Sequence, residues 1–154
     1  METTTVTIED LNDLIQIHND RIVGYERALK DLKNEHAELH REFINMIKES
    51  HQSKMELATE VAALGGEIET GTTMSGKIHR AWIRMMDMFS HKTAKSVLEH
   101  CEFGEDAMLK AYDTALDDEA LPSYIREIVS RQQTAMRAAY NRIKALRDAE
   151  REQS

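Results

Sequence analysis

Apolar side chains recur at alternating steps of three and four residues along four long stretches of the chain. Over residues 7–33 the series on this face is Leu11, Ile15, His18, Ile22, Tyr25, Leu29 and Leu32. Such spacing places the series on one face of an α-helix. Similar series predict helices over residues 35–64, 92–117 and 122–148, and a short helix over residues 75–89. One Pro and six Gly in 154 residues are too few turn signals for many short strands, so we expect an all-α fold.

The lengths of the connections predict how these helices are arranged. The first two long helices are joined by a brief link, and so are the last two, so each pair should form an antiparallel hairpin. The link from Gly65 to Thr93 is long, as expected when a second hairpin is laid beside the first by a crossover. We therefore predict one domain over residues 1–154, a ferritin-like four-helix bundle whose crossover carries the short helix. Thr7 is the expected N-cap of the first helix, with Asp10 at its N3 position.

A weak internal repeat supports the two-hairpin arrangement. The sequence GYERAL at residues 24–29 is echoed by AYDTAL at residues 111–116, an offset of 87 residues. This offset aligns His18 with Glu105 and Tyr25 with Tyr112. The second and fourth long helices match less well at an offset of 81, which aligns residues 44–55 with residues 125–136.

Composition excludes several classes of function. The net charge is −8, whereas a protein that binds nucleic acid usually presents a basic face, so we expect no nucleic-acid partner. No apolar run approaches 18 residues, so we expect no membrane span. The acidic start of the chain lacks the basic and apolar regions of a signal peptide, which predicts a cytoplasmic protein. Cys101 is the only cysteine, so the chain has neither an internal disulfide nor a cysteine zinc site.

Each long helix also carries a polar residue near the middle of its apolar face. These residues are His18, Ser50 (or Ser53), Glu105 and Gln132. Helix midpoints lie at similar heights in an antiparallel bundle, so we expect the four to form one polar layer. A buried carboxylate needs a partner, and His18 is the expected partner of Glu105. The layer is interpreted as a structural network that fixes the register of the helices.

The alternative interpretation of the layer is a metal site. Ferritin-like di-iron proteins use one Glu from each of two helices and a Glu-x-x-His pair from each of the other two. No His in this chain has a Glu three residues before it. The remaining candidate ligands are Glu26, Glu102, Glu105 and His18. Carboxylates with one His suit iron or manganese, but they form a non-standard set.

Several stretches together resemble a known bacterial family. They are LNDLIQIHNDRIVGYERAL, GKIHRAW, LEHCEFGEDAMLKAYDTAL, and LPSYIREIVSRQQ followed by RIKALRD. The chain is similar over nearly its whole length to four-helix-bundle proteins of about 150 residues that are classed as ferritin-like and have no established function. The resemblance implies a ferritin-like fold and a cytoplasmic, stress-related setting. It brings no activity with it.

Two hypotheses of function follow from the sequence. The first is a non-catalytic protein, expected to be a homodimer, that acts by self-association or by binding a protein partner. The second is an oxidase or metal-handling protein that binds iron or manganese. Residues His18, Glu105 and Gln132 are central to the first hypothesis, and the candidate ligands named above are central to the second.

Overall fold

The computed structural model describes residues 2–32, 36–71 and 93–153. This part of the chain contains four long helices, α1 (Glu2–Asp31), α2 (Ala37–Ala63), α4 (Ala94–Leu116) and α5 (Ser123–Gln153). The all-α prediction is therefore confirmed. The short helix predicted over residues 75–89 lies outside the described residues.

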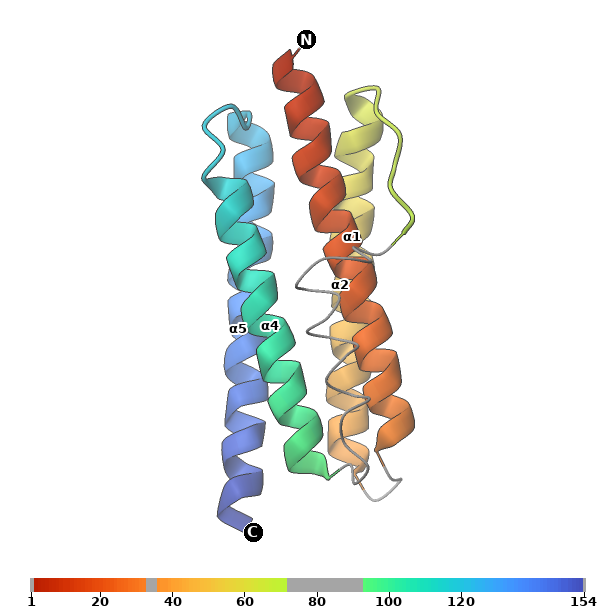
Figure 1. Cartoon of the computed structure of the whole chain (residues 1–154), viewed down its shortest axis with the longest axis vertical. Helices are drawn as coiled ribbons and strands as arrows, with labels where there is room; N and C mark the ends of the chain where they lie inside the picture. Colours follow the sequence, from red (N-terminus) through yellow and green to blue (C-terminus); the bar gives the residue numbers. More distant parts are fainter. Residues whose placement is uncertain (1, 33–35, 72–92, 154) are drawn as a thin grey trace.

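The helices form two antiparallel hairpins, α1 with α2 and α4 with α5 (Figure 1). α2 ends at one end of the bundle and α4 begins at the other, so these two helices run parallel. Between the hairpins, α1 packs against α4 much more extensively than α2 packs against α5. The polar residues of α1 and α4 are thus brought together at the centre, and the side formed by α2 and α5 is looser.

Two helix ends differ from the sequence prediction. α1 begins at Glu2, so Thr7 lies within the helix and is not its N-cap. The Thr7 hydroxyl donates to the Thr3 carbonyl one turn earlier, at 2.9 Å, as helical threonines often do. α5 continues to Gln153, beyond the predicted end at residue 148.

Other helix ends follow from local chemistry. Thr93 caps α4 through a capping box in which it and Ser96 bond reciprocally. α2 ends in a Schellman motif, where Gly66 N–H donates to the Val61 carbonyl at 2.9 Å. Gly65 has a φ of +83°, a conformation that favours glycine. A Cβ on Gly66 would lie 2.8 Å from Ile8 Cγ2, so the chain after α2 passes directly against α1.

The core is built from the apolar faces predicted by the heptad spacing. Its largest fully buried apolar side chains are those of Leu11, Leu14, Ile15, Tyr25, Phe43, Leu57, Leu98, Met108, Tyr112 and Ile125. Burial repeats between α1 and α4 at the predicted offset of 87, for example at Leu11 and Leu98. No helix in the described ranges is long and apolar enough to cross a membrane.

Between α2 and α5 the repeat in burial differs by one residue from the predicted offset of 81. Leu39 and Leu121 are both buried, and so are Ser50 and Gln132, and each pair is 82 residues apart. At an offset of 81, Met55 would match Met136, yet Met55 is 70% exposed and Met136 is fully buried. The sequence match at an offset of 81 therefore paired residues that lie on different faces of α2 and α5.

Candidate functional site

The centre of the bundle holds an ion pair between Arg21 of α1 and Glu105 of α4, and both side chains are 0% exposed. Arg21 Nε donates to Glu105 Oε2 at 3.0 Å, and Nη2 donates to Oε1 at 2.5 Å. The guanidinium thus meets the carboxylate through two parallel hydrogen bonds, the strongest pairing that these groups make. A buried charge without such a partner would be strongly destabilising.

α2 supplies the other partners of the guanidinium. Arg21 Nη1 donates to Ser50 Oγ at 2.9 Å and to the Met46 carbonyl at 3.4 Å, and it lies 3.0 Å from Glu49 Oε1. Burial, the largest single effect, lowers the pKa of Arg21, but the charge of Glu105, the interaction with Tyr25, the hydrogen bond to Glu105 and the charge of Glu49 together raise that pKa above its ordinary value. Arg21 is therefore always a cation, and it joins α1, α2 and α4 through one side chain.

His18 lies one turn before Arg21 on α1 and is also fully buried. Its Nδ1 is 3.0 Å from Ser50 Oγ, and its Nε2 is 2.6 Å from the hydroxyl of Tyr112. Burial, followed by the positive charges of Arg21 and Lys54, lowers the pKa of His18 well below its ordinary value. The ring is therefore neutral, with one nitrogen that donates and one that accepts.

The amide of Gln132 on α5 decides which nitrogen of His18 carries the proton. Gln132 Nε2 donates to Glu56 Oε1 at 2.8 Å, so its Oε1 faces Tyr112 and accepts the hydroxyl proton at 2.7 Å. Having donated its proton to Gln132, the Tyr112 oxygen accepts from His18 Nε2–H. Nδ1 is then the acceptor, and Ser50 donates to it.

Hydrogen bonds consequently run in one direction from the centre of the bundle to its surface and touch all four helices. The successive donors are Arg21, Ser50, His18, Tyr112 and Gln132, and the last acceptor is Glu56. Networks in which every member is satisfied rigidify a core and specify one packing. The arrangement supports a structural role for the interior polar groups.

Two tyrosines related by the internal sequence repeat make equivalent contacts between α1 and α4. Tyr25 of α1 donates to Glu105 Oε1 of α4 at 2.9 Å, and Tyr112 of α4 bonds to His18 of α1 at 2.6 Å. Both Tyr25 and Tyr112, and both His18 and Glu105, are related by the offset of 87 residues. Each tyrosine therefore reaches across to the polar residue of the opposite hairpin, and the two contacts are related by the repeat.

An open polar groove lies between α2 and α5, where those helices separate. It has a volume of about 380 Å³ and is lined by Glu49, Gln52, Ser53, Glu56, Arg131, Gln132 and Ala135. At its surface Arg131 Nη2 pairs with Glu56 Oε2 at 2.6 Å. The groove is the place where the interior hydrogen-bond chain reaches solvent.

The four residues of the predicted polar layer are all buried and belong to this network. The expected pairing within the layer is wrong, because Arg21 and not His18 is the partner of Glu105. His18 bonds to Ser50 and Tyr112 instead. Arg21 was not predicted, although it lies three residues after His18 and four before Tyr25 and so shares their face.

The structure does not bring the four candidate metal ligands together. Glu26 is exposed, and Glu102 is paired with Arg147 at the side of the bundle. Glu105 is held by Arg21, and both ring nitrogens of His18 have partners. Within residues 2–32, 36–71 and 93–153 no group of three or more His, Cys, Asp or Glu side chains is arranged to hold a metal ion.

Among solved structures, the chain is similar to one described as a crystal structure of ferritin like, diiron-carboxylate proteins from Bacillus anthracis str. Ames. The TM-score is 0.68 at 18% sequence identity, and the match covers 95% of this chain and 96% of that one. A search of curated proteins found no match. The structural similarity establishes a ferritin-like fold.

The central residues do not fit the di-iron centre that this fold can carry. Such a centre needs several carboxylates and two histidines facing one another in the bundle core. Here the core holds the cation Arg21, which repels a metal ion and occupies both oxygens of Glu105. His18 already donates from Nε2 and accepts at Nδ1, so neither nitrogen has a free lone pair for a metal.

A comparison with family models gives a match over most of the chain. Residues 6–118 match the family described as Domain of unknown function (DUF2383). The matched region includes all of the central network contributed by α1, α2 and α4, with Gln132 of α5 outside it. This chain therefore belongs to the DUF2383 family and has a ferritin-like fold.

Proposed function

We propose that this protein is a metal-independent helical scaffold that acts without catalysis, by associating with itself or with a protein partner. The observation that carries the proposal is the ion pair of Arg21 and Glu105 at the centre of the bundle. The guanidinium supplies, as a permanent part of the chain, the positive charge that a buried carboxylate requires. The interior network then has a structural role, which leaves the surface for function.

Exposed apolar side chains on three helices support a role in association. They are Ile44 and Met55 on α2, Phe103 on α4 and Tyr124 on α5. Aromatic and methionine side chains are enriched in protein interfaces. We propose a homodimer as the working state, in a cytoplasmic and stress-related setting as the family resemblance implies.

The alternative function is the handling of iron or manganese. It is favoured by the similarity to the protein described as a diiron-carboxylate protein. For this chain it would require Arg21 to leave Glu105, and the freed carboxylate to join ligands that lie elsewhere in the described structure. The two functions therefore predict opposite results in a metal-binding experiment.

Metal loading is the direct test. Protein purified without a chelator is incubated with Mn(II), or anaerobically with Fe(II), then desalted and measured by elemental analysis. We expect well under one metal ion per chain. Stoichiometric metal that is lost in Glu105→Ala and kept in the exposed control Glu99→Ala would overturn the proposal.

Association is tested by light scattering after size exclusion over a wide range of protein concentration. We expect a mass above that of one chain, and a shift toward the monomer in Phe103→Ser or Met55→Ser. A monomer at every concentration would contradict self-association and leave a protein partner as the remaining form of the proposal. Pull-down with Phe103→Ser as the negative control would then decide whether such a partner exists.

A further inference from the structure

Two carboxyl groups meet where the loop between α4 and α5 (residues 117–122) packs against α1. Asp10 of α1 and Asp118 of the loop lie within hydrogen-bonding range of each other. The Oδ2 atom of each is hidden from solvent and receives no N–H or O–H donor from the part of the chain that the structure describes. Two such acceptors can face each other stably only when a proton lies between them.

The surroundings of the pair decide which carboxyl carries that proton. Asp118 Oδ1 accepts from the Ala120 backbone N–H at 2.9 Å, which favours its ionised form. The hydrogen bond from Asp10, followed by the one from Ala120, lowers the pKa of Asp118. Burial, followed by the hydrogen bond and charge of Asp118, raises the pKa of Asp10 to about 7. Asp10 is therefore the donor and Asp118 the acceptor.

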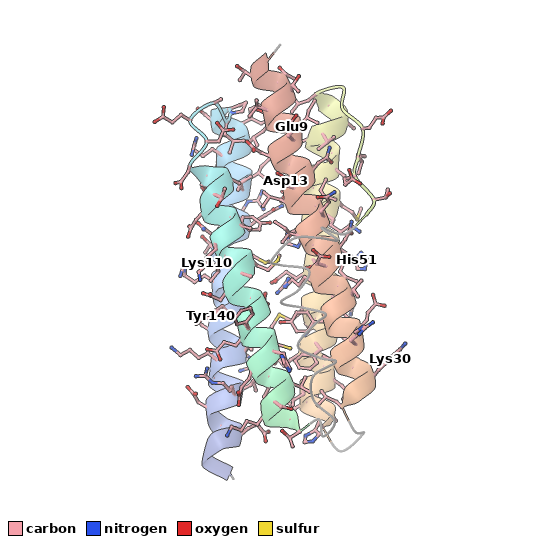
Figure 2. The ribbon with its side chains drawn as sticks, viewed as in Figure 1. Glu9, Asp13, Lys30, His51, Lys110 and Tyr140 are labelled. Carbon is pink, nitrogen blue, oxygen red and sulfur yellow. The ribbon has the colours of Figure 1, made fainter. Side chains whose placement is uncertain are left out.

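Charges on the neighbouring elements act in the same direction. Glu9 and Asp13 on α1 raise the pKa of Asp10 through their negative charge, and Figure 2 shows them on the part of α1 nearest the α4–α5 loop. From α5, Arg126 lowers the pKa of Asp118. The segment after α2 also carries two acidic residues, Glu67 and Glu69, and is held against α1 by bonds between their backbone groups and the Asn12 side chain.

The loop itself is fastened to α5 independently of this pair. Arg126 donates from Nη1 to the Leu116 carbonyl at 2.5 Å and from Nη2 to the Asp118 carbonyl at 2.6 Å. These bonds involve the backbone and an arginine, so they do not change near neutral pH. The side-chain contact of Asp118 with Asp10 on α1 is the part that titrates.

We propose that Asp10 and Asp118 form a pH-sensitive latch, in which a shared proton fastens the α4–α5 loop to α1 and the loss of that proton releases it. When the proton leaves, two carboxylates face each other with hidden oxygens and repel. The loop then separates from α1 or admits water, while Arg126 keeps it attached to α5. The start of α1, the end of α2 and the α4–α5 loop lie at the same end of the bundle (Figure 1), so the release would alter this end.

The raised pKa of Asp10 makes the stability of the folded protein depend on pH. An aspartate whose pKa is raised on folding adds stability below its unfolded pKa, and this contribution is lost as the pH rises through the folded pKa. With a folded pKa of about 7 for Asp10, the contribution declines from near pH 4 and is gone above about pH 7. The local event, loss of the shared proton, is centred near pH 7.

Carboxyl ¹³C NMR titration of the unaltered protein tests the latch without a variant. We expect the Asp10 resonance to titrate close to pH 7, with an accompanying change at Asp118. Titration of Asp10 at the pH of an ordinary aspartate would overturn the proposal. A resonance that titrates near pH 7 without any response from Asp118 or the loop would also overturn it.

Amide hydrogen exchange then tests whether the proton controls the loop. Asp10 goes from about nine-tenths protonated at pH 6 to about one-tenth at pH 8, so we expect protection of residues 117–121 to fall by up to about tenfold, after correction for intrinsic rates. Asp10→Asn supplies a permanent N–H donor to Asp118 and should remove the pH dependence. Asp13→Asn, one turn away, is the matched control and should retain the pH dependence, with its midpoint moved to lower pH because one charge that raises the pKa of Asp10 is removed. Equal protection of the native loop at both pH values, or an unchanged pH dependence in Asp10→Asn, would refute the latch.

Discussion

Arg21 Nη1 lies 2.9 Å from Ser50 Oγ while Arg21 Nε lies 3.0 Å from Glu105 Oε2, so the guanidinium stands between Glu105 and the hydrogen-bond chain that leads to the surface. Arg21 neutralises the carboxylate on one side and donates the first hydrogen bond of the chain on the other. The centre of this ferritin-like bundle is thus held by a side-chain cation.

Removal of one member of the central pair should be far more damaging than removal of both. Glu105→Ala leaves the buried guanidinium with only the partly exposed Glu49 as a carboxylate partner, and we expect it to lower the free energy of unfolding by about 3 kcal/mol. The double variant Arg21→Met with Glu105→Leu should cost less than either single change, because no charge remains buried. Urea unfolding of Glu105→Ala, Arg21→Met and the double variant measures the three effects.

The exposed pair of Arg142 and Glu42 is the control for this comparison. Arg142→Ala should change the free energy of unfolding by no more than about 1 kcal/mol, as for other surface ion pairs. Equal effects of Glu105→Ala and Arg142→Ala would show that Glu105 is not buried with Arg21 in solution.

The two tyrosines related by the repeat should differ in their importance. Tyr112→Phe leaves His18 Nε2–H without an acceptor and Gln132 Oε1 without a donor, so we expect a loss of about 2–3 kcal/mol. Tyr25→Phe removes one donor from Glu105, which keeps its bonds to Arg21, and should cost about 1 kcal/mol. Thermal and urea unfolding of the two variants measure the difference, and a larger loss in Tyr25→Phe would contradict the hydrogen-bond order.

The fold was predictable because its information is local and periodic. The heptad series gave the positions of the four long helices, and the brief and long connections gave the two hairpins. The ends were less predictable, since Thr7 has the chemistry of an N-cap but bonds back within α1. The α2–α5 repeat was misaligned by one residue. The predicted offset of 81 rested on identical residue types, whereas the positions that are buried in both helices are 82 residues apart.

The site was predictable only in part, because a heptad pattern locates buried positions but not the partners of the side chains there. His18, Glu105 and Gln132 interrupt apolar faces and are visible in the sequence. Arg21 follows His18 by one turn, but a charged residue on a helix is normally solvated, so its burial depends on Glu105, 84 residues later. Three-dimensional pairing of that kind has no local signal.

The neutral state of His18 gives a pH dependence of known sign. The folded pKa is lowered, so the stability that the neutral ring provides is present above the unfolded value of about 6.5 and is lost as the pH falls through the lowered pKa. From pH 6.5 to pH 5.5 the loss should approach about 1 kcal/mol. Asp10 contributes with the opposite sign over this range, so the measurement is made in the Asp10→Asn background, where urea unfolding at the two pH values should show the loss and the added change His18→Gln should reduce it. An identical pH dependence in the variant would mean that His18 takes up a proton in the folded protein.

The end of α2 should be sensitive to the backbone at Gly65 rather than to side-chain volume. The residue has a φ of +83° with open space around the position of a Cβ, so Gly65→Ala introduces backbone strain and no clash. We expect a loss of about 1 kcal/mol in the free energy of unfolding. Asn tolerates this conformation better than other residues with a side chain, so Gly65→Asn should recover part of the loss. Equal stability of the alanine and glycine proteins would show that α2 ends differently in solution.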